Sequence, residues 1–352
     1  RQRQMCIRDR CWWKIKLKSQ KFGIEIEMTG LTRKKASEIV AKHFQTDSQY
    51  DGGAYRAYSV KDNEGRKWKL VYDSSITAYI GIRRTYDDDY KVELVSPICK
   101  YDDIEDIQQI VRTLRKDGHA KVNSSCGIHI HIDASKHDAR SLRNITNIMY
   151  SKEDLIYKAL QVEVAREHRY CQKVEESFIQ KLNKSKPKNL SQLKSLWYNG
   201  ETRRSHSHYD NSRYHALNLH SVFQKGTIEF RLFNGTLHAG EIKSYIQFCL
   251  AISHQALTQT KASRRKTHSS NEKYTFRTWL LRLGLIGDEF KTARHHLLKN
   301  LDGCIAWKDP QQALAQKERL KAQRELVLEN PVQNIENTEE LEHEGMSMQQ
   351  QM

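Results

Sequence analysis

Four segments of the chain alternate apolar and charged residues with the period of two that is typical of a β-strand. In residues 22–28, the sequence FGIEIEM places Glu25 and Glu27 on the face opposite the large apolar side chains. The alternation recurs in KVELVSP, CGIHIHID and TIEFRLF, and it predicts a sheet with one apolar and one polar face. The polar positions of these later segments are Glu93, His129, His131, Asp133, Glu229 and Arg231.

The remaining pattern predicts strands and helices without strict βαβ alternation, which favours an α+β fold over a doubly wound sheet. The predicted strands are 22–28, 67–73, 75–82, 90–95, 127–133 and 227–233. The predicted helices are 32–44, 103–117, 139–150, 153–168 and 241–258, and residues 173–195 are predicted to be helical with a break near Pro187. Residues 261–271, KASRRKTHSSN, are predicted to form a polar loop.

Composition divides the chain into three regions. Residues 1–20 lack periodicity and are interpreted as an N-terminal arm, with a translated assembly scar as the alternative. Residues 21–309 form the predicted main domain, in which 134–200 is largely helical. Residues 310–352 are predicted to form a solvated helix over 311–329 and then an acidic, glutamine-rich disordered tail.

The bulk composition narrows the class of protein. The 352 residues are 38% hydrophobic and carry a net charge of +16, which reflects solubility or favours polyanionic partners. Seven cysteines are widely spread without a CxxC pair, which argues against a zinc ribbon or a disulfide framework. No long apolar run or secretory signal is present, so no membrane association and a cytoplasmic location are expected.

The charged face of the predicted sheet is unusual because it carries glutamate and histidine where threonine, lysine or serine would serve equally well. Two carboxylates about 4 Å apart repel by roughly 4 kcal/mol at an effective dielectric constant near 20. A cluster of them therefore needs cations or protons, and oxygen ligands with an imidazole suit magnesium or manganese. Glu25 and Glu27 are two positions apart on one strand, about 6.5–7 Å, which fits two neighbouring ions better than one.

Three further residues each have a structural and a functional interpretation. Asp73 ends a predicted strand and either forms a turn or lies near substrate. Arg213 is either solvated or holds a phosphate or carboxylate with its two-pronged guanidinium. Cys126 has no sequence neighbour that would activate it, so we interpret it as a small packed residue rather than a nucleophile.

The order of the motifs FGIEIE, DSS, ELVSP, CGIHIHID, RYHALNL and TIEFRLFNGT closely resembles the putative amidoligase family. That family is grouped with glutamine synthetase and glutamate–cysteine ligase among the carboxylate–amine ligases. The resemblance covers about residues 21–258 and implies a glutamine-synthetase-like catalytic domain, in which helices back a curved, mostly antiparallel sheet. Where related enzymes often have glycine in an Asp-Gly-Ser turn, this chain has Ser74, and serine tolerates a positive φ poorly.

The resemblance also implies roles for individual residues. The residues that match metal ligands are Glu25, Glu27, Glu93, His129 and Glu229. His131 matches a histidine near the nucleotide phosphates, Arg231 matches an arginine that faces phosphate, and Arg213 fits loosely as a phosphate or substrate arginine. Glu229, Arg231, Arg213 and Asp73 are the expected catalytic residues.

The implied activity is an ATP-dependent ligation that uses Mg²⁺ or Mn²⁺. A small-molecule or peptide carboxylate would be phosphorylated to an acyl phosphate, and an amine would then displace phosphate to form an amide. The alternatives are a guanidino phosphotransferase of the same fold, a metal-dependent nuclease and a nucleic-acid-binding module. The last explains the charge but not the acid-lined strands, because glutamates repel phosphates unless a metal intervenes. Nucleic acid is therefore not an expected partner of the protein.

Overall fold

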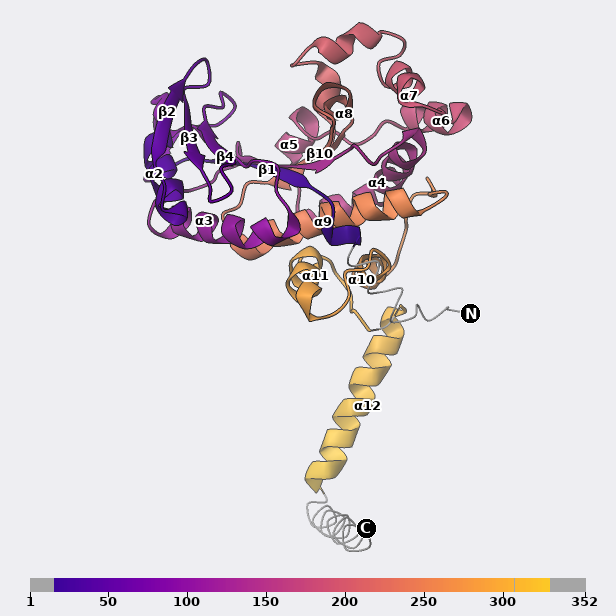
Figure 1. The fold of residues 1–352 in the computed structure, drawn as a ribbon. Helices are drawn as coiled ribbons and strands as arrows, with labels where there is room; N and C mark the ends of the chain where they lie inside the picture. Colours follow the sequence, from indigo (N-terminus) through magenta and orange to yellow (C-terminus); the bar gives the residue numbers. More distant parts are fainter. Residues whose placement is uncertain (1–15, 307, 330–352) are drawn as a thin grey trace, which may run out of the picture. The chain divides into compact units, whose positions relative to one another are not determined.

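The structure is a computed structural model that describes residues 16–306 and 308–329 (Figure 1). The chain divides into two compact units. The larger unit runs to His268 and resumes over Phe276–Leu301, and the smaller contains Ser269–Thr275 and begins again at Asp302. Most of the expected N-terminal arm, and the tail expected to be disordered, lie outside the described residues. Among the described residues, no helix is long and apolar enough to cross a membrane.

The larger unit is an α+β fold built on one large antiparallel sheet. Eight strands pair in the order β2-β3-β4-β7-β1-β8-β10-β9, and neighbouring strands run antiparallel. The strands are β1 (Phe22–Met28), β2 (Ser48–Gly52), β3 (Ala57–Lys61), β4 (Lys67–Val71), β7 (Val92–Val95), β8 (Gly127–Asp133), β9 (Leu217–Asn218) and β10 (Thr227–Asn234), and β5 (Tyr79–Ile80) pairs separately with β6 (Arg83–Arg84).

Helices cover the apolar face of this sheet. The side chains of Ile24, Ile26, Ile128 and Ile130 are buried in one core with those of the helices, and α3 and α9 lie side by side along the sheet (Figure 1). The described residues form the helices α2 (Arg33–Phe44), α3 (Ile104–Lys116), α4 (Ala139–Leu160), α5 (Val164–Arg169), α6 (Glu176–Ser185), α7 (Leu190–Trp197), α8 (His220–Lys225), α9 (Ala239–Thr258), α10 (Glu272–Arg282) and α11 (Lys291–Leu298), with 3₁₀ turns η1 (Asp88–Tyr90), η2 (Tyr101–Asp103), η3 (Thr202–His206), η4 (Asn211–Arg213) and η5 (Asp288–Phe290). A further helix, α12 (Pro310–Glu329), belongs to the smaller unit.

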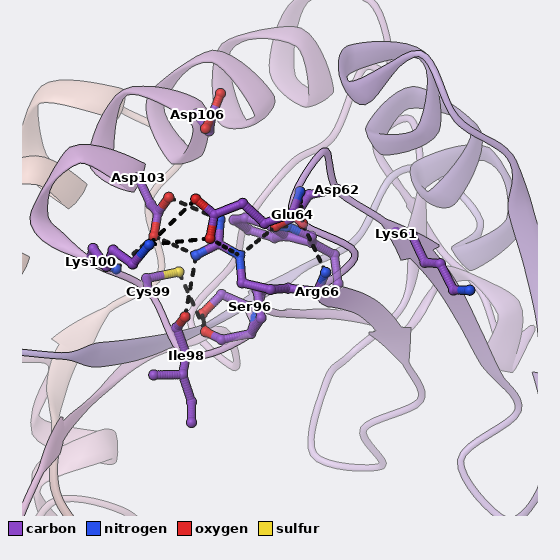
Figure 2. Close-up of polar contacts among 12 residues, drawn as sticks. Lys61, Asp62, Glu64, Arg66, Ser96, Ile98, Cys99, Lys100, Asp103 and Asp106 are labelled. Atoms are coloured by element: carbon purple, nitrogen blue, oxygen red, sulfur yellow. Dashed lines mark hydrogen bonds and ion pairs between the residues drawn. The ribbon is translucent and has the colours of Figure 1, made fainter.

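A partly buried ion-pair network ties the β3–β4 turn to the start of α3 (Figure 2). The Arg66 guanidinium donates to both carboxylate oxygens of Asp103, at 2.7 and 2.9 Å, and to Asp62 Oδ2 at 2.8 Å. Asp62 also accepts from the Trp68 indole at 3.1 Å. This two-pronged geometry fixes the hairpin that carries β4 against the helical layer.

The apolar–polar alternation predicted the central strands well. β1 and β8 have the predicted bounds, and β10 extends one residue beyond the prediction. The predicted break near Pro187 is confirmed, because α6 ends at Ser185 and α7 begins at Leu190. The polar loop after α9 and the helix predicted over 311–329 are also present.

Three predicted elements differ from the structure. The predicted strand 75–82 contains only the short β5, because side chains rather than a neighbouring strand bond to the backbone of Thr77. Ser125 Oγ accepts from Thr77 N at 2.8 Å, and Asn123 Nδ2 donates to Thr77 O at 2.8 Å. The predicted helices 139–150 and 153–168 are instead one continuous α4 and a separate α5. Gln161, in the left-handed conformation at φ 49°, ends α4.

Candidate active site

Strand pairing brings the acidic and imidazole side chains of the sheet into register on one face. Glu25 on β1 is directly opposite His129 on β8, and Glu27 is directly opposite Glu93 on β7. Residues directly opposite in an antiparallel pair have Cβ atoms about 4.5–5.5 Å apart on the same face. Four predicted ligands from three separate motifs therefore converge.

The row of polar side chains continues across β8 and β10. His131 is directly opposite Glu229, which is in turn opposite Asn218 on β9. Asn218 Nδ2 donates to Glu229 Oε2 at 2.7 Å, and the Arg231 guanidinium donates to Glu229 Oε1. Glu229 is buried, and these two donors fix the orientation of its carboxylate.

The two histidines flank Glu25. His129 Nδ1 lies 3.1 Å from Glu25 Oε2, and His131 Nε2 lies 3.3 Å from Glu25 Oε1. His131 Nδ1 lies 3.0 Å from Thr227 Oγ1, whereas its buried Nε2 makes no hydrogen bond among the described residues. Burial lowers the pKa of His131, but the charges of Glu25 and Glu229 outweigh it and raise that pKa, so Nε2 could bind a cation only after losing its proton.

Side chains on this face form three overlapping groups of potential metal ligands. Within each group, the oxygen and nitrogen atoms lie within 4.8 Å of one another. Carboxylate oxygens with one imidazole fit magnesium or manganese, so the residues present fit the divalent ions predicted from the sequence. The groups are Glu25 with Glu93 and His129, Glu25 with His131 and Glu229, and Glu27 with Asp73 and Glu93.

Two of the glutamates are poorly stabilised as anions by the protein alone. Burial, and secondarily the Asp73 carboxylate, raise the pKa of Glu27 to about 8, although Gly127 N donates to its Oε2 at 2.6 Å. Burial, together with the charges of Glu25 and Glu27, raises the pKa of Glu93 well above its usual range. A dication near these side chains would favour their ionised forms.

Two other residues have lowered pKa values, which favour the ionised form of Glu229 and the neutral form of His129. Burial alone would raise the pKa of Glu229, but the charges of Arg231, His131 and His129 together outweigh it and lower that pKa to about 2. Burial and the charge of Arg231 lower the pKa of His129 to about 4. At neutral pH the site therefore holds an ionised carboxylate beside a neutral imidazole whose lone pair is available to a metal.

A cavity of about 460 Å³ opens above the acidic face. Asp73 and Arg213, which sequence reasoning placed near substrate, both line it, as does Arg231. His131 and Glu229 adjoin the cavity through Glu25. The other predicted site residues that line it are Glu25, Glu27, Glu93 and His129.

The arginines occupy different environments. Arg231 is buried, and its guanidinium is committed to Glu229 and, through Nε, to Tyr170 O at 3.4 Å. Arg213 is partly exposed, stacks near the rings of Tyr209 and Tyr214, and donates to His208 O at 3.3 Å. Arg213 is thus the arginine whose guanidinium remains more accessible to an anion in the cavity.

Sequence reasoning missed Arg166 on α5, which also lines the cavity. Its side chain is buried, its Nη2 donates to Arg231 O at 3.3 Å, and its Nε makes no hydrogen bond among the described residues. A Cβ at Gly127 would lie 2.3–2.7 Å from its guanidinium atoms, so any larger residue at the start of β8 would require this guanidinium to move. Gly127 was the feature of the sequence that could have indicated a close approach here, but the sequence does not show which side chain approaches it.

Two questions raised by the sequence are answered by local structure. Burial raises the pKa of the Cys126 thiol to about 12, in agreement with a packed residue rather than a nucleophile. Asp73 Oδ1 accepts from Ser75 N at 2.6 Å and forms a turn, in which Ser74 does not adopt a positive φ. The serine therefore introduces no strain of the kind that the missing glycine suggested.

A family model described as putative amidoligase enzyme matches residues 18–253, a range that includes every side chain of the cluster. No curated protein matches the chain.

Proposed function

Because the chain belongs to the putative amidoligase family, we propose that it is an ATP- and magnesium-dependent carboxylate–amine ligase. Manganese would serve in place of magnesium. The observation that carries this proposal is the set of three overlapping ligand groups, which draws on four adjacent strands and Asp73. An antiparallel sheet with such a row of acids and histidines also supports a glutamine-synthetase-like arrangement of the catalytic domain.

Four glutamates and one histidine would bind metal, and the second histidine would lie near phosphate. Glu25, Glu27, Glu93, His129 and Glu229 would hold the divalent ions. When bound, these ions would supply positive charge to the phosphates of ATP and to the phosphoryl group during its transfer. His131, whose Nε2 faces Glu25, would lie at the phosphate end of the cavity.

The proposed reaction has two chemical steps. An oxygen of the substrate carboxylate attacks the γ-phosphorus of ATP, and the bond to the β,γ-bridging oxygen breaks, giving an acyl phosphate and ADP. The amine then attacks the acyl carbon, the C–O bond to phosphate breaks, and an amide and inorganic phosphate are released. Arg213, accessible in the cavity wall, would bind an anionic oxygen of substrate.

Asp73 is the proposed acceptor of the proton that the amine loses. Its carboxylate lines the cavity next to Glu27 and Glu93, and its Oδ1 is oriented by Ser75 N. No protein nucleophile is required, which agrees with the buried, unreactive Cys126 thiol. Arg231 acts through Glu229, because its guanidinium holds that carboxylate in place.

A screen for ADP release tests the proposal. Pools of carboxylates and amines are incubated with the protein, ATP and Mg²⁺, and mass spectrometry searches for products that have lost one water relative to acid plus amine. We expect release that requires both substrates and that Glu229→Ala abolishes. A stable phosphorylated product would instead identify a guanidino phosphotransferase, and nucleic-acid cleavage without ATP would identify a nuclease.

A further inference from the structure

The polar loop that follows α9 is anchored to α4 on both sides of its basic residues. Asn144 Nδ2 donates to Gln259 O at 2.7 Å, and its Oδ1 accepts from Ala262 N at 3.1 Å. Farther along, Thr267 N donates to Ser151 O at 3.0 Å. The intervening residues, Ser263, Arg264 and Arg265, are exposed. The loop therefore presents its basic side chains from a backbone fixed on both sides.

Helix α6 forms the opposite wall of a groove along this loop. Ile179 and Leu182 anchor α6 in the interior, and the amides of Asn183 and Asn147 exchange hydrogen bonds at 2.7 and 2.8 Å. Two cavities, of about 780 and 410 Å³, adjoin here, because Gln180, Ser263 and Arg264 line both of them. We define the basic groove by the residues Gln180, Asn183, Lys184, Lys186, Lys261, Ser263, Arg264 and Arg265.

Cations dominate the basic groove, and their charge is not neutralised locally. Lys184, Lys186, Lys261, Arg264 and Arg265 form no ion pair with any carboxylate among the described residues. The adjacent Lys266 differs, because its ammonium is bound to Glu153 at 2.9 Å and Asp154 at 3.2 Å. Glu176 lines one end and accepts from Gln180 Nε2 at 3.2 Å. Five like charges across one groove favour a ligand that carries several negative charges.

We propose that the basic groove binds the sugar–phosphate backbone of a nucleic acid. Protein partners are usually anchored by exposed aromatic or apolar side chains, and the groove offers none: Tyr150 and Ile179, which line it, are buried. Nucleic-acid interfaces are more polar and more positive, and amide and hydroxyl groups such as those of Gln180 and Ser263 contact phosphates. Without an exposed aromatic ring for base stacking, contacts are to the backbone and do not select a sequence.

This site is separate from the acidic face, whose glutamates repel phosphates in the absence of metal. It accounts for part of the net charge of +16 that the proposed ligase chemistry leaves unexplained. The groove proposal does not depend on the proposed ligase function.

Fluorescence anisotropy of the full chain with labelled DNA and RNA of about 20 nucleotides, single-stranded and duplex, tests the proposal. EDTA is included so that metal at the acidic face contributes nothing. The groove variant is Lys184→Gln/Lys186→Gln/Arg264→Gln. The control is Lys34→Gln/Lys35→Gln/Arg115→Gln, which removes the same charge from exposed positions of α2 and α3.

We expect the groove variant to weaken binding by at least about tenfold near 0.1 M salt and to reduce the slope of log K against log salt by about 2. The control variant should change the slope by less than about 0.5. Equal losses in both variants, or no binding by the parent protein, would overturn the proposal. So would poly-glutamate binding with the same tightness and the same dependence on the groove residues, which would identify an acidic polypeptide as the partner. Circular dichroism verifies folding, and Arg264→Gln/Arg265→Gln, confined to the loop, replaces the groove variant if that variant unfolds.

Discussion

The phenol oxygens of Tyr55 and Tyr209 lie 3.4 Å apart and connect the β2–β3 turn to the segment before η4. Both side chains line the cavity, and they are 50% and 64% exposed. The contact therefore lies at the solvent-exposed rim of the cavity. It links two segments that are separated by 154 residues and that supply different parts of the cavity wall.

Removing one hydroxyl should loosen this rim. An exposed hydrogen bond contributes about 0.5–1.5 kcal/mol, so we expect Tyr209→Phe to speed amide hydrogen exchange in residues 205–214 by roughly two- to tenfold. The control is Tyr86→Phe, because Tyr86 is 89% exposed and does not line the cavity. Hydrogen-exchange mass spectrometry measures the difference. Unchanged exchange in Tyr209→Phe would show that the contact does not hold the segment.

Gly127→Ala should displace the Arg166 guanidinium, because the new Cβ would lie 2.3–2.7 Å from its atoms. Such overpacking of a buried site typically costs about 1–3 kcal/mol. We expect a lower urea midpoint with an unchanged m-value. We also expect weaker Mg²⁺ binding in isothermal titration calorimetry, because Gly127 N donates to Glu27 Oε2 and the backbone there would shift.

Gly23→Ala is the matched control on β1. A Cβ at Gly23 would meet its nearest neighbours at 3.8–4.0 Å, which is ordinary contact, and the strand backbone there does not have a positive φ. We expect this variant to unfold at the parent's urea concentration or slightly above it, since alanine loses less backbone entropy than glycine. Equal destabilisation of both variants would mean that the Arg166 contact is not the cause.

Local alternation was sufficient to predict β1 and β8 because each alternates isoleucines on one face with glutamates or histidines on the other. The same reasoning could not find β2, whose residues SQYDG have no apolar face and are mostly exposed. Its pairing depends on β3, and therefore on contacts between segments. The short β9 was missed for the same reason, since its two residues are defined by pairing with β10.

The residue types of the candidate site could be predicted from the sequence, but the strand pairing that brings them together could not. The charged positions of each motif were visible, yet the pairing of Glu25 with His129 joins residues 104 apart. Arg166 was invisible because its place in the cavity depends on where α5 begins after the left-handed Gln161 ends α4. The roles assigned to the individual metal and phosphate ligands stay predictions.

Arg66→Met should be strongly destabilising. The change leaves Asp62 and Asp103 without their shared guanidinium, and their side chains are only 2% and 11% exposed. Removing one partner of a buried ion pair typically costs about 3–5 kcal/mol, and we expect the lower end because the Arg66 side chain is 21% exposed and Asp62 keeps the Trp68 indole as a donor. Urea denaturation measures the loss.

Lys100→Met provides the comparison for Arg66→Met. The ammonium of Lys100 lies 3.2 Å from Glu64, but the two side chains are 63% and 55% exposed. An exposed pair of this kind contributes about 0–1 kcal/mol. A loss for Arg66→Met no larger than the loss for Lys100→Met would contradict a structural role for the network at the β3–β4 turn.

The raised pKa of Glu27 predicts how pH affects the stability of the metal-free protein. Burial, with the Asp73 charge, raises that pKa to about 8, whereas the pKa of a glutamate in an unfolded chain is about 4.3. Between these values the folded protein keeps a proton that the unfolded chain has released. The stabilising contribution is therefore fully present below the unfolded pKa and is lost as pH rises towards the folded pKa.

Glu27→Gln should remove this loss because the amide resembles the protonated acid. In EDTA at about pH 8 we expect the variant to be more stable than the parent by more than about 1 kcal/mol, and at about pH 5 the difference should be small. Mg²⁺ should stabilise the parent and not the variant, since binding requires the carboxylate. Urea denaturation at both pH values, with and without Mg²⁺, measures all four combinations, and Glu105→Gln, which removes a 70%-exposed carboxylate on α3, is the control. A parent and variant that lose stability in parallel between the two pH values would show that Glu27 does not carry this proton.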